Sequence, residues 1–395
     1  MHVVGRETAL RENADAGAND RGSDGVGDGD SDDTPRAGRL GRYLARDGST
    51  GAPVGIDLDR PHAGLVVGKR GAGKSHTLGV LAEATARARG VAPVVVDPMG
   101  AFAGLATEAD STTAPVPAQV IDRPTIRVSA VPPADWPALV GLDAASAPGA
   151  LVWDAAASAA SLDGMLDRVN GADDGRGVRR AARNHLARAL EWDVFDPAGL
   201  TAGDLFGPAA TVLSLDGVAD APTSAVVGAV ARMLYDARTG ASGPDRLPWL
   251  LVDEAHVAVD GVAGAALRAL LTRGRAPGVS LVLATQRPSA LPAVATSQAD
   301  LLVAHRLTSQ ADIDALGAAS PTYLSGTLRE RLPTGRGEAL IVDDATESTH
   351  TLRVRERHTP HGGHTPRASE IAASDSASGD DRRETDRWEH ANGEV

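Results

Sequence analysis

Short runs of consecutive apolar residues alternate along the middle of the chain with longer stretches in which apolar residues recur every three or four positions. Short continuous runs are typical of strands that are buried on both faces, and the wider spacing is typical of helices that pack against them. The alternation predicts an α/β fold with a mostly parallel sheet flanked by helices. The expected strands are residues 64–68, 92–97, 125–129, 210–217, 248–254, 279–286, 300–306 and 337–343.

The alternation stops at about residues 133–205, where successive segments have only the helical spacing. We expect a helical insertion that packs on the sheet. Residues 1–36 and 367–395 are rich in small and acidic residues and lack apolar periodicity. Because such segments cannot bury enough apolar surface to offset the entropy lost on ordering, both are predicted to be disordered acidic tails. Residues 37–62 then form a short β-rich lead-in to a core at 63–366.

Composition and charge limit the classes of protein to consider. The chain has 395 residues, of which 42% are hydrophobic, enough for a sizeable buried core. Its formal charge of −13 is concentrated in the two tails, which carry −5 and −4, so a basic patch on the body remains compatible with it. The absence of cysteine excludes disulfides and thiol chemistry. No apolar run approaches the roughly 20 residues of a membrane span, and we therefore expect a cytoplasmic protein without a membrane partner.

The turn after the first core strand has the pattern of a phosphate cradle. Its sequence GKRGAGKS, residues 68–75, matches G-x-x-x-x-G-K-[ST] between an expected strand and an expected helix. The glycines allow backbone N–H groups to point inward, Lys74 would hold the β- and γ-phosphates, and the Ser75 hydroxyl would bind Mg²⁺. ATP and Mg²⁺ are therefore the predicted cofactors, and a glycine-rich turn without a ligand is the alternative. The predicted nucleotide-binding residues in this turn are Gly68, Gly71, Ala72, Gly73, Lys74, Ser75 and His76.

A second motif, WLLVDEAH at residues 249–256, ends an apolar strand in two adjacent acids. Asp253 is predicted to hold Mg²⁺, and Glu254 is predicted to polarise the attacking water as a general base. Asp216 ends another expected strand but lacks a neighbouring acid, which makes Asp253 the better choice. The alternative is that the acids only cap the following helix. For His256, a local packing role and a catalytic role remain equally open.

Gln286 ends the apolar strand 279–286. An amide can donate and accept hydrogen bonds without adding charge, so Gln286 is predicted to sense whether the γ-phosphate is present. The carboxyl ends of parallel strands share one edge of a sheet, where ligands of open α/β sheets bind. We therefore expect Lys74, Glu254 and Gln286 to converge on one catalytic site.

The order of the motifs VVGKRGAGKSHTLGVLAE, VVVDPMGAF, LLVDEAH, ATQRPS and RERHTPHGGHTP resembles that of the HerA/FtsK ATPases, and most closely that of archaeal HerA-like proteins. The resemblance spans about residues 62–366, apart from the insertion. It implies a RecA-like P-loop NTPase core, assembly into a homo-hexameric ring, and ATP-driven translocation or unwinding of DNA. The small number of lysines and the many acids also resemble the composition of proteins from salt-loving archaea.

The resemblance also implies roles for individual residues. Arg275 matches an arginine finger that a neighbouring subunit contributes, with Arg273 as a nearby substitute. Asp97 matches an acid near the metal and the nucleotide, although an Asp-Pro turn after a strand is an equally weighted interpretation. Arg306 is left open between the nucleotide site and the pore. The Arg-rich segment 176–188 is a candidate DNA contact, and a solvated helix face is the alternative.

The chain departs from the HerA pattern at its start. HerA proteins usually begin with a small β-barrel, whereas residues 37–62 suffice for a couple of strands. A nuclease partner that docks on the barrel is therefore in doubt. Two further functions stay open: a conjugation-type or phage-type pump, and a nucleotide-dependent scaffold without motor activity. Glu254 and Arg275 argue against the scaffold, because a protein that only binds ATP needs neither a base nor a finger.

Overall fold

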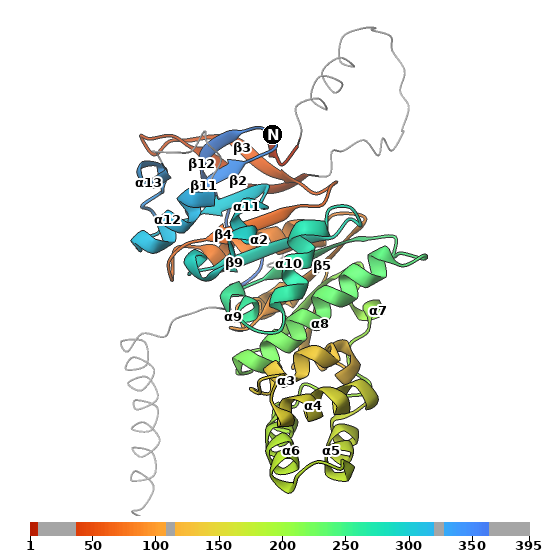
Figure 1. Cartoon of the computed structure of the whole chain (residues 1–395). Helices are drawn as coiled ribbons and strands as arrows, with labels where there is room; N and C mark the ends of the chain where they lie inside the picture. Colours follow the sequence, from red (N-terminus) through yellow and green to blue (C-terminus); the bar gives the residue numbers. More distant parts are fainter. Residues whose placement is uncertain (7–36, 108–114, 320–327, 363–395) are drawn as a thin grey trace, which may run out of the picture.

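Seven parallel strands form one side of a twelve-stranded sheet in the computed structural model, which describes residues 1–6, 37–107, 115–319 and 328–362 (Figure 1). Their order across the sheet is β10-β4-β9-β8-β5-β7-β6. Their bounds are β4 Ala63–Val67, β5 Val91–Asp97, β6 Ala118–Asp122, β7 Ala210–Ser214, β8 Leu247–Val252, β9 Ser280–Thr285 and β10 Leu301–Ala304. Because all seven run in one direction, the turns that follow β4, β8 and β9 meet at the same edge.

The sheet continues beyond β10 in a mostly antiparallel extension of order β1-β3-β2-β12-β11. Its strands are β1 His2–Val4, β2 Ala37–Leu44, β3 Thr50–Asp57, β11 Glu338–Asp343 and β12 Ser348–Val354. The lead-in 37–62 thus supplies two strands of the main sheet, and β1 pairs in parallel with β3. β12 pairs with β2, which joins the C-terminal part of the described chain to its N-terminal lead-in.

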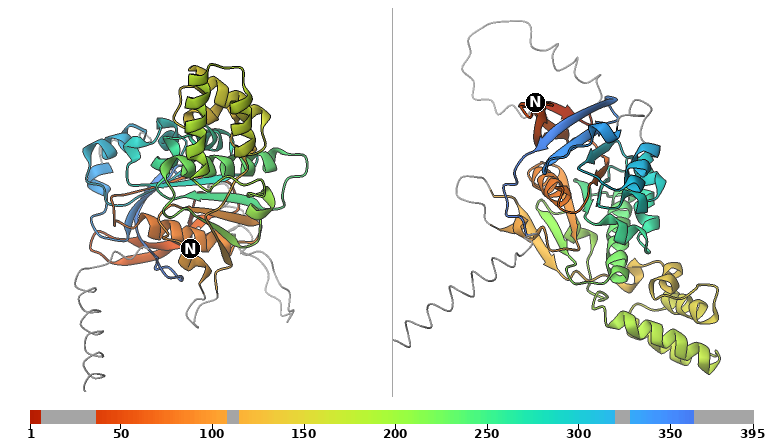
Figure 2. Two further views of the ribbon diagram at one scale, coloured as in Figure 1. Left: turned by 90° about the horizontal axis from the view of Figure 1, so that it is seen from below. Right: turned by 90° about the vertical axis from the view of Figure 1, so that its left-hand side faces the viewer.

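Helices cover both faces of the sheet (Figure 2). Alternate residues of β4 enter two cores: Val66 packs with Leu78 of α2 on one face, whereas Leu65 packs on the other face with the helices that follow β7. The helices are α2 Lys74–Ala86 on the first face, and α8 Asp220–Thr239, α9 Ala255–Val259, α10 Gly264–Arg273, α11 Ala293–Ser297, α12 Gln310–Ala319 and α13 Leu328–Arg331. Short 3₁₀ turns occur at η1 Ala103–Ala106, η2 Val128–Ala130, η3 Pro133–Asp135 and η4 Pro288–Ala290.

Residues 133–205 fold as helices that stand off the α/β body on the side of α8 (Figures 1 and 2). The helices are α3 Trp136–Leu139, α4 Ala147–Ser158, α5 Leu162–Gly171, α6 Arg176–Leu190 and α7 Ala202–Leu205. Ser146 and Ser161 begin α4 and α5, and each hydroxyl accepts a backbone N–H at 3.1 Å. The buried side chains Trp136, Met165 and Leu186 belong to the same core as the α8 face, so the insertion is packed on the body.

The expected α/β class and the parallel sheet flanked by helices are confirmed, but two local predictions are wrong. Residues 125–129 form no strand: Ile126 makes one isolated bridge to Phe195, and the strand at that edge is β6, whose side chains are partly exposed. His2–Val4 is a strand and not part of a disordered tail, because it pairs in parallel with β3, and Arg6 beside it pairs with Asp57 at 3.1 Å. The rest of that tail and residues 367–395 lie outside the described residues. No described helix combines the length and apolarity that crossing a bilayer requires, and the cytoplasmic location stays a prediction.

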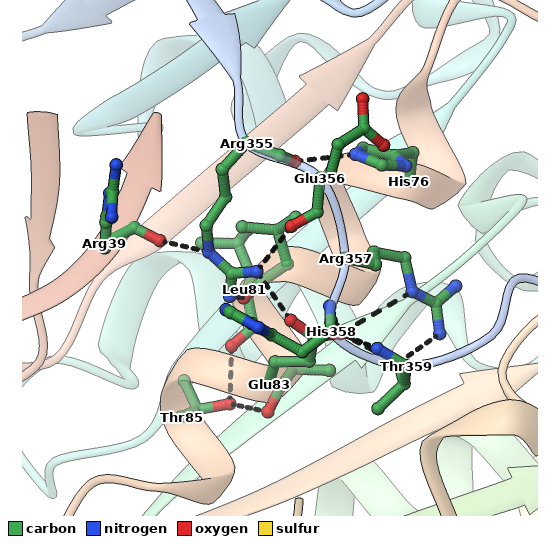
Figure 3. A network of polar contacts seen from close by, with 12 residues as sticks. Arg39, His76, Leu81, Glu83, Thr85, Arg355, Glu356, Arg357, His358 and Thr359 are labelled. Carbon is green, nitrogen blue, oxygen red and sulfur yellow. Dashed lines mark hydrogen bonds and ion pairs between the residues drawn. The ribbon is translucent and has the colours of Figure 1, made fainter. Parts of the chain in front are cut away.

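The segment that follows β12, residues Arg355–Gly362, crosses α2 and is here called the C-terminal strap (Figure 3). It is fastened to Glu83 of α2, a carboxylate that is completely buried. The Glu83 oxygens accept bonds from Arg355 Nη1 at 2.7 Å, from the N–H groups of His358 and Thr359 at 2.8 and 2.9 Å, and from the Thr359 hydroxyl at 2.8 Å. Burial raises the pKa of Glu83, but these hydrogen bonds and the Arg355 charge outweigh it and hold the pKa below its ordinary value.

We predict that Glu83→Ala lowers the free energy of unfolding by about 3 kcal/mol or more, because the Arg355 charge and two buried donors lose their acceptor. Chemical denaturation at neutral pH checks this. Glu356→Ala, a change of the same kind at an exposed strap residue, serves as the control and should change stability by less than about 0.5 kcal/mol.

The contacts of Glu83 also predict how the stability of the protein depends on pH. The lowered pKa of Glu83 means that its stabilisation is present above 4.5, the ordinary value, and is lost as the pH falls through the lower folded value. The stabilities of the wild type and Glu83→Ala should therefore converge in acid. A difference that stays constant from neutral to acidic pH would contradict an ionised Glu83.

Candidate nucleotide-binding site

The turn between β4 and α2 has the backbone that a phosphate cradle requires. Gly71 and Gly73 have φ angles of +76° and +123°, which strain any residue with a side chain. A Cβ atom at Gly68 would lie 2.6 Å from Cβ of His305, so Gly68 is required for close packing. Gly73 is also the N-cap of α2, where no described side chain caps the free N–H groups. The turn thus presents backbone donors and the positive end of a helix to an anion.

Lys74, the first residue of α2, is only 5% exposed. Burial and the positive end of the helix dipole both disfavour an ammonium group in this place, so it needs negative charge nearby. Its charge interacts with the carboxylates of Asp253 and Glu254. A triphosphate held by the turn would place further negative charge beside it, which is the role predicted from the motif.

The Ser75 hydroxyl donates a 2.8 Å hydrogen bond to Oδ2 of Asp253, which joins the two motifs. Asp253 follows β8 and is 2% exposed, and its Oδ1 accepts the N–H of Glu254 at 3.0 Å. Burial raises the pKa of Asp253, whereas the bond from Ser75 and the charge of Lys74 lower it. A hydroxyl and a carboxylate are hard oxygen ligands, and Mg²⁺ commonly takes one or two such groups beside water and phosphate. The pair therefore fits Mg²⁺ bound together with a nucleotide.

Glu254 has a left-handed backbone with φ of +45°, which is uncommon for a residue with a side chain. It precedes α9, but its side chain makes no capping hydrogen bond to the described residues of that helix, contrary to the capping alternative. Oε2 is buried, lacks a hydrogen-bond partner within the described ranges, and lies 3.4 Å from Nδ1 of His256. Burial raises the pKa of Glu254, while Lys74 and the Gln286 backbone lower it. A more basic carboxylate with an unused oxygen is suited to accept a proton from water.

Gln286 and His256 adjoin this carboxylate. Gln286 follows β9, which pairs with both β4 and β8, and its backbone interacts with Glu254. Nδ1 of His256 lies 3.3 Å from the Thr285 hydroxyl, and burial together with the charge of Arg287 lowers the pKa of His256. The structure therefore brings Lys74, Glu254 and Gln286 to one edge of the sheet, with His256 in a local contact between β8 and β9.

Three other predicted residues lie differently. Both carboxylate oxygens of Asp97 accept N–H groups of the loop that follows β5, with bonds of 2.9 and 2.8 Å from Ala101 and Phe102. These contacts fit the interpretation of Asp97 as a turn residue. Burial and the charge of the nearby Asp253 raise the pKa of Asp97. Arg275 is exposed and precedes β9, at the sheet edge opposite the phosphate turn. Arg306 is exposed, and its carbonyl accepts the N–H of Lys69 at 2.9 Å.

His305 packs against the phosphate turn, and no motif in the sequence predicts this contact. It is fully buried, and burial lowers its pKa to about 4, so the ring is neutral. Nδ1 donates to the Glu338 carbonyl at 2.8 Å, which leaves Nε2 to accept from the Thr77 hydroxyl at 2.8 Å. The ring also lies 3.2 Å from the position of a Cβ atom at Gly73. His305 therefore connects β10, β11 and α2 at the phosphate turn.

His76 and Ala72, which the motif assigns to the nucleotide, also connect the turn to the end of the domain. The His76 ring contacts the Arg355 carbonyl at 2.8 Å through Nε2, so the C-terminal strap is bonded to α2 one residue after Ser75 (Figure 3). The Ala72 carbonyl accepts the N–H of Gly337 at 3.3 Å. The C-terminal part of the chain thus contacts the phosphate turn at Ala72 and the start of α2 at His76.

Comparisons with known proteins agree with this fold. Residues 39–161 match the family described as the central domain of the helicase HerA, a match that covers the phosphate turn and less than a third of the chain. A search among curated proteins finds no match.

Solved structures share the fold over most of the chain. VirB4 of Thermoanaerobacter pseudethanolicus is 18% identical with a TM-score of 0.62, covering 84% of this chain and 98% of that one. The unbound bacterial conjugative coupling protein TrwBdeltaN70 is 15% identical with a TM-score of 0.55, covering 81% and 90%. TrwB in complex with the non-hydrolysable GTP analogue GDPNP is 17% identical with a TM-score of 0.54, covering 76% and 87%. At these identities the similarity shows the fold.

The RecA-like fold and the paired motifs at one sheet edge are those of a P-loop ATPase. The expectation of an ATP-hydrolysing enzyme is confirmed at this level.

We predict that Gly73→Ala weakens nucleotide binding by about tenfold to a hundredfold, because a side chain at this φ costs about 1–3 kcal/mol of strain and its Cβ would press on His305. Titration with a fluorescent ATP analogue measures the effect. Gly317→Ala, in the middle of α12 with open space around its Cβ position, is the matched control and should bind like the wild type. Equal affinities of the two variants would contradict the phosphate cradle.

Proposed function

We propose that this protein is an ATP-hydrolysing DNA translocase or helicase of the HerA type, which acts as a homo-hexameric ring. The observation that carries the proposal is the Ser75–Asp253 hydrogen bond with the strained Glu254 beside it. It supports the proposal because Ser75 and Asp253 would serve as a metal ligand pair and Glu254 as a base for a nucleotide held by the phosphate turn. The match to the HerA central domain supports DNA as the substrate.

In the proposed reaction each residue has one task. The turn amides and Lys74 bind the β- and γ-phosphates, and Gln286 reports the γ-phosphate through its amide. Ser75 and Asp253 hold Mg²⁺, which neutralises charge on the phosphate oxygens when bound. Glu254 accepts a proton from the attacking water at its unbonded Oε2, for which its raised pKa suits it.

Arg275 is proposed to act on the site of a neighbouring subunit. Six-residue β9 separates it from Gln286, a length of about 20 Å, so Arg275 lies far from the phosphate turn of its own chain. The nearby Arg273 lies over the ring of Tyr235 at 5.9 Å. A site completed in trans would require assembly into a ring before hydrolysis.

A second candidate is a conjugation-type or secretion-type pump. The observation in its favour is the similarity in fold to VirB4 and to the conjugative coupling protein TrwB over most of both chains. Movement along free duplex DNA by the isolated ring, measured by displacement of a bound streptavidin block, favours the translocase. ATPase activity that responds to an envelope partner and not to DNA favours the pump. A nuclease partner is expected only if the protein is the DNA translocase.

We predict that Glu254→Gln reduces ATP hydrolysis by about 10² to 10⁴-fold while ATP binding is retained, because the amide keeps the shape but accepts no proton. Steady-state phosphate release with and without DNA, together with nucleotide titration, measures both effects. Asp236→Asn makes the same chemical change at a carboxylate near the C-terminal end of α8 and provides the control. Wild-type ATPase activity that is identical with and without DNA would contradict the motor and favour the scaffold.

We predict that Arg275→Ala lowers ATP hydrolysis by about 10³ to 10⁵-fold without loss of ATP binding, because a trans arginine stabilises charge that develops only in the transition state. Mixing Arg275→Ala with Glu254→Gln subunits provides the decisive measurement. Random assembly gives about a quarter of the interfaces an intact Glu254 and an intact Arg275, so activity should partly return. Absence of recovery in verified mixed rings would place Arg275 outside the neighbouring site.

A further inference from the structure

Helix α6 of the insertion carries an unusual charge pattern. Its fifteen residues, RGVRRAARNHLARAL, contain five arginines and no acid. Surface helices commonly combine both signs at spacings of three and four, because opposite charges there attract and like charges repel. Gly175, the N-cap, offers no side-chain cap, and arginines occupy the first turn, where the helix dipole favours anions. The pattern is electrostatically unfavourable for the isolated subdomain.

The packing of α6 fixes which arginines face outward. Ala182, Leu186 and Ala189 are buried on its inner side, and Nδ1 of His185 contacts the Val140 carbonyl at 2.7 Å. Arg179 donates to two backbone carbonyls at the end of α5, at 3.2 Å each, and has a structural role.

The arginine stripe, defined as Arg176, Arg180 and Arg183, lies on the opposite side and is exposed. Spacings of four and three residues align the three side chains within about 10 Å along the helix. Within the described ranges, none of the three makes a hydrogen bond or an ion pair. The stripe thus offers three uncompensated cations on a subdomain that stands off the body (Figure 2).

The surroundings of the stripe offer charge and little else. Gly177 and Ala187 are its small neighbours on the helix, and the exposed Leu190 lies about 10 Å beyond Arg183. Protein interfaces depend on buried aromatic and aliphatic anchors, and the large apolar side chain that α6 itself exposes is Leu190. Asp173 and Asp174 precede α6 and line a concave surface between α4 and α5 with Asp154. A regularly charged polyanion fits such a surface better than a folded protein does.

We propose that the arginine stripe binds the phosphate backbone of nucleic acid without reading its sequence. This inference rests on the proposed DNA motor and adds a contact outside the ring body. A chain with a formal charge of −13 repels a polyanion at long range, so it needs local cations to hold one. Guanidinium groups in a row bind successive phosphates and release condensed counterions, which makes the contact dependent on salt.

The test replaces the three arginines by glutamine, Arg176→Gln, Arg180→Gln and Arg183→Gln, and measures binding of duplex and single-stranded oligonucleotides across a salt series by fluorescence anisotropy. We expect weaker binding, and for duplex DNA a fall of about 2 to 3 in the slope of log K against log[salt], from roughly 0.9 for each phosphate that the variant no longer neutralises. The corresponding triple lysine variant should keep most of the slope, because a point charge suffices for this contact. ATP hydrolysis without DNA should stay at the wild-type rate in both variants.

A control removes the same charge elsewhere: Arg42→Gln, Arg46→Gln and Arg329→Gln change three exposed arginines outside the insertion and should leave the slope unchanged. Circular dichroism and thermal unfolding check that the glutamine variant is folded. The inference is overturned if the wild type binds DNA and the stripe variant has the same slope. It is also overturned if the wild type binds no DNA, in which case the proposed motor fails with it. Stripe-dependent binding of polyglutamate in the absence of DNA binding would assign the stripe to an acidic protein instead.

Discussion

The hydrogen bond between Ser75 and Asp253 is the contact on which the functional part of this molecule depends. It joins the start of α2 to the end of β8 at an edge where Lys74 and Asp253 are both buried. Buried charges are tolerated only when they are paired. The strand order β4-β9-β8 brings Lys74 and Asp253 together, so the stability of this edge depends on that order. The requirement for accurate packing and the requirement for phosphate and metal binding are satisfied by the same residues.

Two polar connections from the last third of the chain hold this edge in place. His305 spans β10, β11 and α2 as a neutral, fully bonded ring, and the C-terminal strap fastens Glu83 through Arg355 and Thr359. Networks of this kind rigidify a site because every member is satisfied, and removal of one member leaves a buried group without a partner. The phosphate turn is thus supported by His305 after β10 and by the C-terminal strap.

Electrostatics divides the molecule into two regions with different functions. At the sheet edge, the buried charge of Lys74 interacts with the carboxylates of Asp253 and Glu254, as expected for a site that binds a nucleotide with its metal. On α6, like charges are exposed and unbalanced, as expected for a surface that attracts a polyanion. The α8 face connects the two, because the core of the insertion and the core behind β8 are continuous. In a DNA motor this continuous packing would link the nucleotide site to the nucleic-acid contact.

The sequence by itself determined the sheet strands with continuous apolar runs, the phosphate turn and the acids after β8, because each of these is encoded in a few consecutive residues. Only the tertiary structure decided the rest. β6 is a half-exposed edge strand without an apolar run, and β1 depends on its pairing with β3, more than 45 residues away in the sequence. His305 bonds to a threonine 228 positions away, and Glu83 bonds to donors more than 270 positions away. Such partners are chosen by strand order and chain crossing, which local patterns of hydrophobicity and spacing do not contain.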